Sequence, residues 1–164
     1  MCTGVRFGDG AGNMYFGRNL DWSCGYGEKV VITPRGYKYK SAFLGQMANS
    51  PAIIGMGIVA ENTPLYFDCA NEWGLAIAGL NFPGYAAYAP SAVDGKTNVA
   101  AYEFPLWVVA NFETVDEVEE ALANAAIVDK PINEKFPSSL LHWIIGDATR
   151  SVVVEYTEAG MQVF

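Results

Sequence analysis

The sequence predicts a single α+β domain in which strands come first, two helices follow, and strands return. Strands are indicated where apolar or alternating runs stand between Gly, Pro and Asn residues. Helices are indicated where apolar residues recur at three- and four-residue spacing. The chain shows no linker, repeat or low-complexity segment, so residues 1–164 are predicted to form one domain or a piece of one.

The first two predicted strands form a hairpin. Residues 3–7 and 14–21 alternate as strands do, and the glycine-rich segment 8–13 between them is typical of a turn. The hairpin is therefore expected to return residues 18–21 toward Cys2.

Six further strands are predicted from apolar or alternating runs with the same boundary residues. They cover residues 29–33, 52–59, 65–69, 74–81, 140–147 and 150–156.

Two helices are predicted between these strands. One begins near Phe104 and Pro105, because proline suits the first turn of a helix. The other begins after Thr114, which stands three residues before Glu117 and makes a capping box with it. Apolar residues then recur as far as Ala125, and the acidic residues among them form a solvated face.

Cys2 is the residue of greatest chemical interest. Removal of Met1 would put a thiol and a free α-amine on one residue, and methionine is normally removed when the next side chain is small. A thiol ordinarily has a pKa of about 8.5 and an α-amine one of about 7.7–8.0, so the amine can take the thiol proton. The alternative is a cysteine that follows methionine by chance.

Arg18 and Asp21 lie on opposite faces of the second strand, at the end expected near Cys2. A guanidinium near the thiol would favour the thiolate, and a carboxylate near the α-amine would orient it. The alternative interpretation is an ordinary surface ion pair, which contributes little.

Short runs spread along most of the chain carry a resemblance to known proteins. They are MCTG (1–4), GRNLDW (17–22), TPRGY (33–37), YFDCANE (66–72), GLAIAGLNFPGY (74–85), EFPLW (103–107) and SLLHW (139–143). Together they resemble the choloylglycine hydrolases, bile salt hydrolases and penicillin V acylases of the N-terminal-nucleophile hydrolase superfamily, and the bile-salt branch in particular. The resemblance implies that superfamily's αββα four-layer sandwich.

Residue by residue, the resemblance implies Cys2 as nucleophile, Arg18 and Asp21 as its supports, and Asn81 in the oxyanion hole. It implies hydrolysis of the amide in a conjugated bile salt, with penicillin V as the alternative substrate, and assembly as a homotetramer. Members of the family are roughly twice as long as this chain. The sandwich is therefore expected to be incomplete, with a second oxyanion-hole asparagine and a further active-site arginine beyond residue 164. A non-catalytic remnant that acts only through association is the competing hypothesis.

Four apolar side chains near the segments that support Cys2 are the candidates for a substrate pocket. They are Leu20, Trp22, Tyr26 and Phe67, and such a group suits a steroid or an aryl ring. The alternative is that these aromatic residues belong to the core.

Composition narrows the class of protein. The chain has 51% hydrophobic residues, enough for a core, and a net charge of −8 with no basic patch, which argues against a nucleic-acid partner. No apolar stretch approaches the ~18–20 residues of a membrane span, and the start lacks the features of a signal peptide, so we expect a cytoplasmic protein with no membrane partner. Cys24 and Cys69 are expected to be free structural thiols.

No cofactor or metal is predicted. Residues 55–60 fit G-x-G-x-x-A, but Pro64 follows where a dinucleotide-binding helix would begin. His142 is the only histidine, so the sequence gives little indication of a metal site and favours a structural role for this residue.

Overall fold

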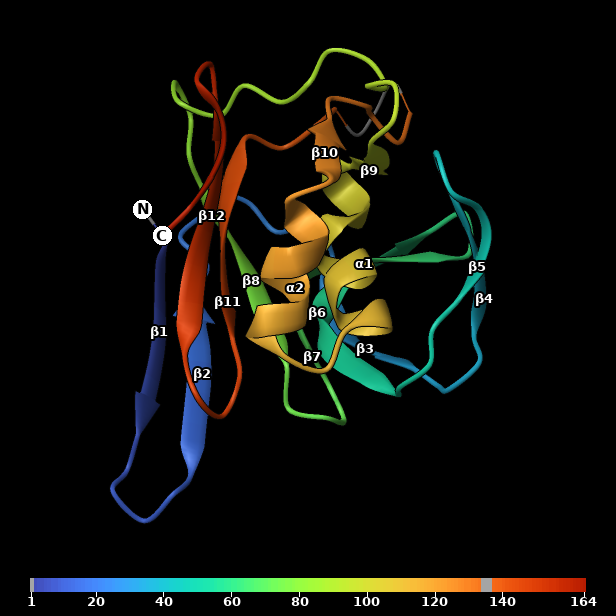
Figure 1. Cartoon of the computed structure of the whole chain (residues 1–164). Helices are drawn as coiled ribbons and strands as arrows, with labels where there is room; N and C mark the ends of the chain where they lie inside the picture. Colours follow the sequence, from blue (N-terminus) through green and yellow to red (C-terminus); the bar gives the residue numbers. More distant parts are fainter. Residues whose placement is uncertain (1, 134–136) are drawn as a thin grey trace.

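A seven-stranded sheet in the order β13-β12-β11-β8-β7-β6-β3 forms the centre of the molecule (Figure 1). The computed structural model describes residues 2–133 and 137–164. The sheet contains β3 (Lys29–Thr33), β6 (Ile53–Ala60), β7 (Thr63–Asn71), β8 (Ala76–Asn81), β11 (Leu141–Gly146), β12 (Ser151–Thr157) and β13 (Gly160–Val163). Each neighbouring pair is antiparallel.

Helices cover one face of this sheet. They are α1 (Phe104–Asn111), α2 (Val115–Leu122) and a short 3₁₀ helix, η1 (Ala101–Glu103). Phe104 packs edge-on against the fully buried Trp143 of β11, with ring centroids 4.7 Å apart. Ile77 of β8 and Ile145 of β11 belong to the same core cluster, so the core lies between the sheet and the helices.

Both helices begin where the sequence predicts. Pro105 occupies the first turn of α1. Thr114 Oγ1 accepts the Glu117 backbone N–H at 3.2 Å, while the Glu117 carboxylate accepts from the Glu113 backbone one residue outside the expected box. The second helix ends earlier than predicted, because Ala125 already belongs to β10.

A hairpin lies on the opposite face of the sheet. It consists of β1 (Thr3–Gly8) and β2 (Met14–Asn19), and it packs over β8 and β11 (Figure 1). The hairpin and the sheet approach each other closely at Gly4, because a Cβ atom added to this glycine would lie 2.8 Å from Ile144 Cγ2 of β11. Helices, sheet and hairpin thus form three successive layers, which is an incomplete version of the expected αββα sandwich within the α+β class.

Two small sheets flank the central one. In the first, β4 (Lys38–Ser41) pairs with β5 (Gly45–Ala48); in the second, β9 (Thr97–Ala100) pairs in parallel with β10 (Ala125–Val128). The buried Glu103 carboxylate accepts from Ser41 Oγ at 2.9 Å and from the Ala42 N–H at 2.8 Å, which fastens the first of these sheets to the start of α1. Burial raises the pKa of Glu103.

The predicted strands are all present. Residues 29–33 are β3 as predicted, and the other strands have shifted ends. The predicted strand 14–21 ends at Asn19, and the predicted strand 65–69 runs from Thr63 to Asn71. The sequence prediction missed β4, β5, β9, β10 and β13. These strands are four residues long each, too short for alternation to stand out.

Part of the hairpin-side face of the sheet is uncovered. Val30 and Ile32 of β3 are 63% and 67% exposed, and Ile54 of β6, paired with Ile32, is exposed beside them. An apolar surface on these two strands therefore remains in contact with solvent.

In the described part of the chain, none of the helices has the length and apolar character needed to cross a membrane.

Candidate active site

The hairpin register brings Cys2 to the end of β2. Thr3 pairs with Asn19, and Gly4 pairs with Arg18. Because side chains alternate along a strand, Cys2, Gly4 and Arg18 lie on the hairpin face that is turned toward the central sheet. Cys2 stands one residue before the start of β1 and is half-buried.

Asn19 connects the N-terminal segment to Asp21. Its Oδ1 accepts the Thr3 backbone N–H at 2.6 Å, and its Nδ2 donates to Asp21 Oδ1 at 3.0 Å. No role for Asn19 was predicted from the sequence. The available signal was its predicted face, which it shares with Asp21.

Arg18 is buried between the hairpin and the sheet. Its side chain is 4% exposed, and its Nε donates to Asp68 Oδ2 at 2.9 Å. Its Nη1 atom is buried and has no hydrogen-bond partner among the described residues. Arg18 is therefore not part of an ordinary surface ion pair, and its partner Asp68 is a residue that the sequence analysis left without a role.

Asn81 ends β8, opposite Leu141. The Phe82 N–H donates to the Leu140 carbonyl at 2.8 Å, so the next pair inward, Asn81 and Leu141, is a non-hydrogen-bonded pair. The backbone N–H of Asn81 accordingly points away from β11, toward the side of β7. The ladder between β7 and β8 extends only to the pair of Asp68 and Ala78.

The side chain of Asn81 points to the helix side of the sheet, away from the hairpin. Leu80, one residue earlier, lies close to Gly4 of the hairpin, so alternation puts the Asn81 side chain on the helix side. Any contribution of Asn81 to a site near Cys2 therefore belongs to its backbone N–H.

Three of the four predicted pocket residues meet. The rings of Trp22 and Tyr26 stack with centroids 6.4 Å apart, and Tyr26 contacts Phe67 edge-on at 5.8 Å. Leu20, Trp22 and Tyr26 are exposed and Phe67 is partly buried, so this group is a surface feature and not part of the core.

A β-bulge directs Phe67 to this side of the sheet. Met56 pairs with Asp68 while the next residue, Gly57, pairs with Tyr66, which leaves Phe67 as an extra residue in β7. Tyr66 points into the core, where its hydroxyl bonds Thr33 Oγ1 at 2.6 Å. Phe67 and Asp68 both reach the hairpin side, as their contacts with Tyr26 and Arg18 show.

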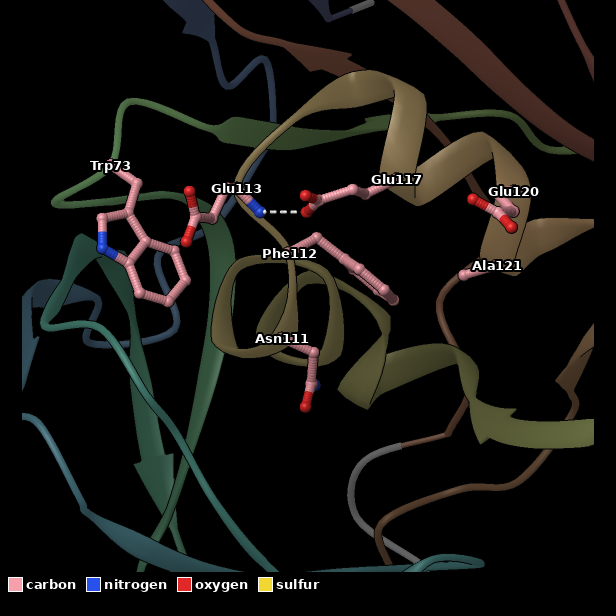
Figure 2. Close-up of a pocket in the computed structure, with 7 residues that line it drawn as sticks. All are labelled: Trp73, Asn111, Phe112, Glu113, Glu117, Glu120 and Ala121. Carbon is pink, nitrogen blue, oxygen red and sulfur yellow. Dashed lines mark hydrogen bonds between the residues drawn. The ribbon is translucent and has the colours of Figure 1, made fainter.

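A surface hollow of about 510 Å³ lies on the helix side and contains none of the predicted site residues (Figure 2). Its lining is Trp73, Asn111, Phe112, Glu113, Glu117, Glu120 and Ala121. With three carboxylates around it, this hollow is unfavourable for an anionic ligand.

The described residues contain no group of three or more His, Cys, Asp or Glu side chains arranged to hold a metal ion. Cys24 is exposed and Cys69 is buried, both as free thiols, and burial raises the pKa of Cys69. His142 Nδ1 lies 3.3 Å from Glu155 Oε1, and its ring stacks on Phe82 at 4.5 Å.

A family model described as linear amide C–N hydrolases, choloylglycine hydrolase family, matches residues 2–164. The chain belongs to the choloylglycine hydrolase family. This membership agrees with the resemblance seen in the sequence, and the matched region begins at Cys2.

Individual members of the choloylglycine hydrolase family are closely similar to this chain. A bile salt hydrolase/transferase of Bifidobacterium longum subsp. longum is 58% identical over 164 residues, which are 99% of this chain and 51% of that protein. The crystal structure of the mutant C2A conjugated bile acid hydrolase from Clostridium perfringens matches with a TM-score of 0.95 and 42% identity, over 100% of this chain and 50% of that one. The chain spans about half the length of the curated relatives it matches.

A penicillin V acylase from Agrobacterium tumefaciens shares the fold. It matches with a TM-score of 0.75 at 21% identity, over all of this chain and 49% of that one.

Proposed function

We propose that this chain supplies the nucleophile of a conjugated bile salt hydrolase, which cleaves the amide between a bile acid and glycine or taurine. The observation that supports this most is the shared inward face of the hairpin, which carries Cys2 and the buried Arg18. The relatives named as bile salt and bile acid hydrolases support the substrate class.

In the proposed reaction, Met1 is removed and the α-amine of Cys2 takes the thiol proton, directly or through one water. The thiolate attacks the amide carbon, and the Asn81 backbone N–H donates to the oxyanion. The resulting α-ammonium protonates the leaving nitrogen, the C–N bond breaks, and a thioester remains on Cys2. Water then attacks the thioester, the α-amine takes a proton from that water and returns it to the departing sulfur, and free bile acid leaves.

Arg18 and Asp21 serve as supports for the nucleophile in this proposal. The guanidinium of Arg18 favours the thiolate, and its desolvation makes the effect stronger than at a surface. Asp21 is held by Asn19, whose other end binds the backbone next to Cys2, so its carboxylate is suited to orienting the α-ammonium.

The surface formed by Leu20, Trp22, Tyr26 and Phe67 is the proposed contact for the steroid body, since a bile acid needs an apolar platform. Penicillin V carries an aryloxyacetyl group in place of a steroid and is the alternative substrate.

Assembly as a homotetramer and a cytoplasmic location are also part of this proposal. The relatives are about twice as long as this chain, and the family resemblance implies a second oxyanion donor in their further residues. We therefore expect slow turnover from these 164 residues, since one such donor contributes about 10²–10³ in rate.

The test is incubation of the chain with glycocholate, taurocholate and penicillin V, following release of the amine. Intact mass first establishes that Met1 is absent, because a retained methionine leaves no α-amine on Cys2. Faster release of glycine or taurine than of the penicillin nucleus supports the proposal. Preferential cleavage of penicillin V supports the alternative, and no release from any substrate supports the non-catalytic hypothesis.

A further inference from the structure

Asp68 is the ionic partner of a buried guanidinium that the proposed chemistry uses. Its Oδ2 accepts from Arg18 Nε at 2.9 Å, although the two residues are 50 positions apart in the chain. The side chain of Asp68 is 33% exposed, whereas that of Arg18 is 4% exposed. The carboxylate is therefore the solvent-facing member of the pair.

The bulge at Phe67 lies directly beside Asp68. One extra residue in β7 breaks the alternation between Tyr66 and Asp68. Bulges of this kind re-aim side chains and are common next to active sites. Here the bulge is followed by the residue that binds Arg18.

The contact uses one edge of the guanidinium only. Nε is bound to Asp68, while Nη1 is buried and has no partner among the described residues. A buried donor without a partner is costly, about 1–3 kcal/mol and more for a charged group. Such an atom is suited to a negative group that exists during the reaction, such as a thiolate.

We propose that Asp68 is a positioning residue: it holds Arg18 by Nε so that Nη1 faces the thiolate of Cys2. This inference rests on the proposed function, which gives Arg18 and Cys2 their roles. Asp68 touches neither substrate nor the reacting atoms, and it acts through Arg18.

Other charged groups on the facing elements have partners of their own. Arg6, on the same hairpin face, donates through Nε to the Asp147 carbonyl at 3.2 Å. His142, on the facing side of β11, lies beside Glu155. Asp21 binds Asn19.

The proposed role of Asp68 and a simple charge effect predict opposite changes in the rate of Cys2 alkylation when Asp68 is removed. A carboxylate near a thiol opposes ionisation, so removal of the charge alone would increase the thiolate and speed its alkylation. If Asp68 instead holds Arg18 in place, its removal frees the guanidinium, decreases the thiolate and slows alkylation.

The experiment measures the rate at which iodoacetamide modifies Cys2 at pH 6.5, by mass spectrometry of the N-terminal peptide. The background is Cys24→Ser, since Cys24 is exposed. The variants are Asp68→Ala, Asp68→Asn, Arg18→Leu and the double variant Arg18→Leu/Asp68→Ala. Glu72→Gln is the matched control, because Glu72 follows the same strand and pairs with the surface Arg35.

We expect Asp68→Ala and Arg18→Leu each to slow alkylation about threefold or more. This is the net effect of about a tenfold loss of thiolate, because a more basic thiolate is also a stronger nucleophile and offsets part of that loss. Asp68→Asn keeps an oxygen for Nε and should react at least as fast as the background. The double variant should be no slower than Arg18→Leu, and Glu72→Gln should change nothing.

The inference is overturned if Asp68→Ala is as fast as the background or faster while Arg18→Leu is slow. It is also overturned if Asp68→Ala slows the Arg18→Leu chain further, because Asp68 then acts independently of Arg18. If Arg18→Leu itself has no effect, the role of Arg18 in the proposed function fails first.

A measurement on the unaltered chain covers the case in which Asp68→Ala does not fold. The Nε–H of Arg18 should exchange with solvent at least tenfold more slowly than that of Arg35 in ¹⁵N spectra, because Arg18 is buried and Arg35 is 73% exposed. Equal exchange rates would show that the buried pair of Arg18 and Asp68 does not persist in solution and would overturn the inference.

Discussion

Asn19 lies directly opposite Thr3 in the hairpin, and its side chain accepts the Thr3 backbone N–H at 2.6 Å. The same side chain donates to Asp21 at 3.0 Å. One amide thus fixes the backbone beside the proposed nucleophile and holds the carboxylate proposed to orient its amine.

Asn19→Ala should loosen the N-terminal segment. The change removes both hydrogen bonds, each worth about 0.5–1.5 kcal/mol, so the Thr3 amide should exchange several-fold faster and any amidase activity should fall. Hydrogen exchange followed by mass spectrometry measures this. Unchanged exchange at Thr3 would show that the hairpin pairing alone fixes the segment.

Cys2→Ser should nearly abolish amidase activity without loss of the fold. The α-amine remains, but an alcohol is a far weaker nucleophile than a thiol near neutral pH. Amine release from glycocholate and the circular dichroism spectrum are the measurements. Cys24→Ser is the control, because Cys24 is exposed and should not be required; a folded but inactive Cys24→Ser chain would mean that the wrong cysteine has been assigned.

Acid should destabilise the fold through Asp147. Burial raises its pKa, but hydrogen bonds from Val115, Thr149 and Arg150 outweigh burial and lower it to about 2. A depressed pKa adds stability that is present above the unfolded value near 3.8 and is lost as the pH falls through about 2. The contribution is about 1–2 kcal/mol after allowance for solvent screening.

Melting temperatures between pH 5 and pH 2 check this prediction. Asp147→Asn should lower the melting temperature at pH 7 and flatten its fall in acid. If the acid dependence is as steep in Asp147→Asn as in the parent, other carboxylates are responsible.

The uncovered apolar surface should make the isolated chain self-associate. Ile32 is 67% exposed on β3, an edge strand of the sheet, and exposed apolar edges favour association. Ile32→Lys should shift the chain toward monomer in light scattering at micromolar concentration. Val93→Lys, at an exposed loop position, is the control and should leave association unchanged.

Local sequence patterns predicted the first hairpin well. Its strands alternate and its turn is glycine-rich, so both the pairing and the return of Arg18 toward Cys2 followed from short-range information. The roles of Cys2, Arg18 and Asp21 came from the chemistry and expected placement of these residues as well as from the family resemblance. That of Asn81 came from the resemblance alone, and all four remain proposals.

Long-range features of the site could not be predicted in this way. Nothing near Asp68 in the sequence indicates that Arg18 packs against it, and an inserted strand residue such as Phe67 leaves no mark on an otherwise apolar run. The direction of the Asn81 N–H depends on which pairs in the β8–β11 ladder are hydrogen-bonded, which only the register reveals.

The proposed function requires that a conjugated bile salt acylates Cys2. The most direct measurement is the mass of the Met1-free chain after acid quenching of a reaction with excess glycocholate, followed by peptide mapping. We expect a cholyl adduct on the Cys2 peptide that is absent from the Cys2→Ser chain. A folded chain with a free Cys2 that takes no acyl group, or one acylated at Cys24 or Cys69 instead, would contradict it.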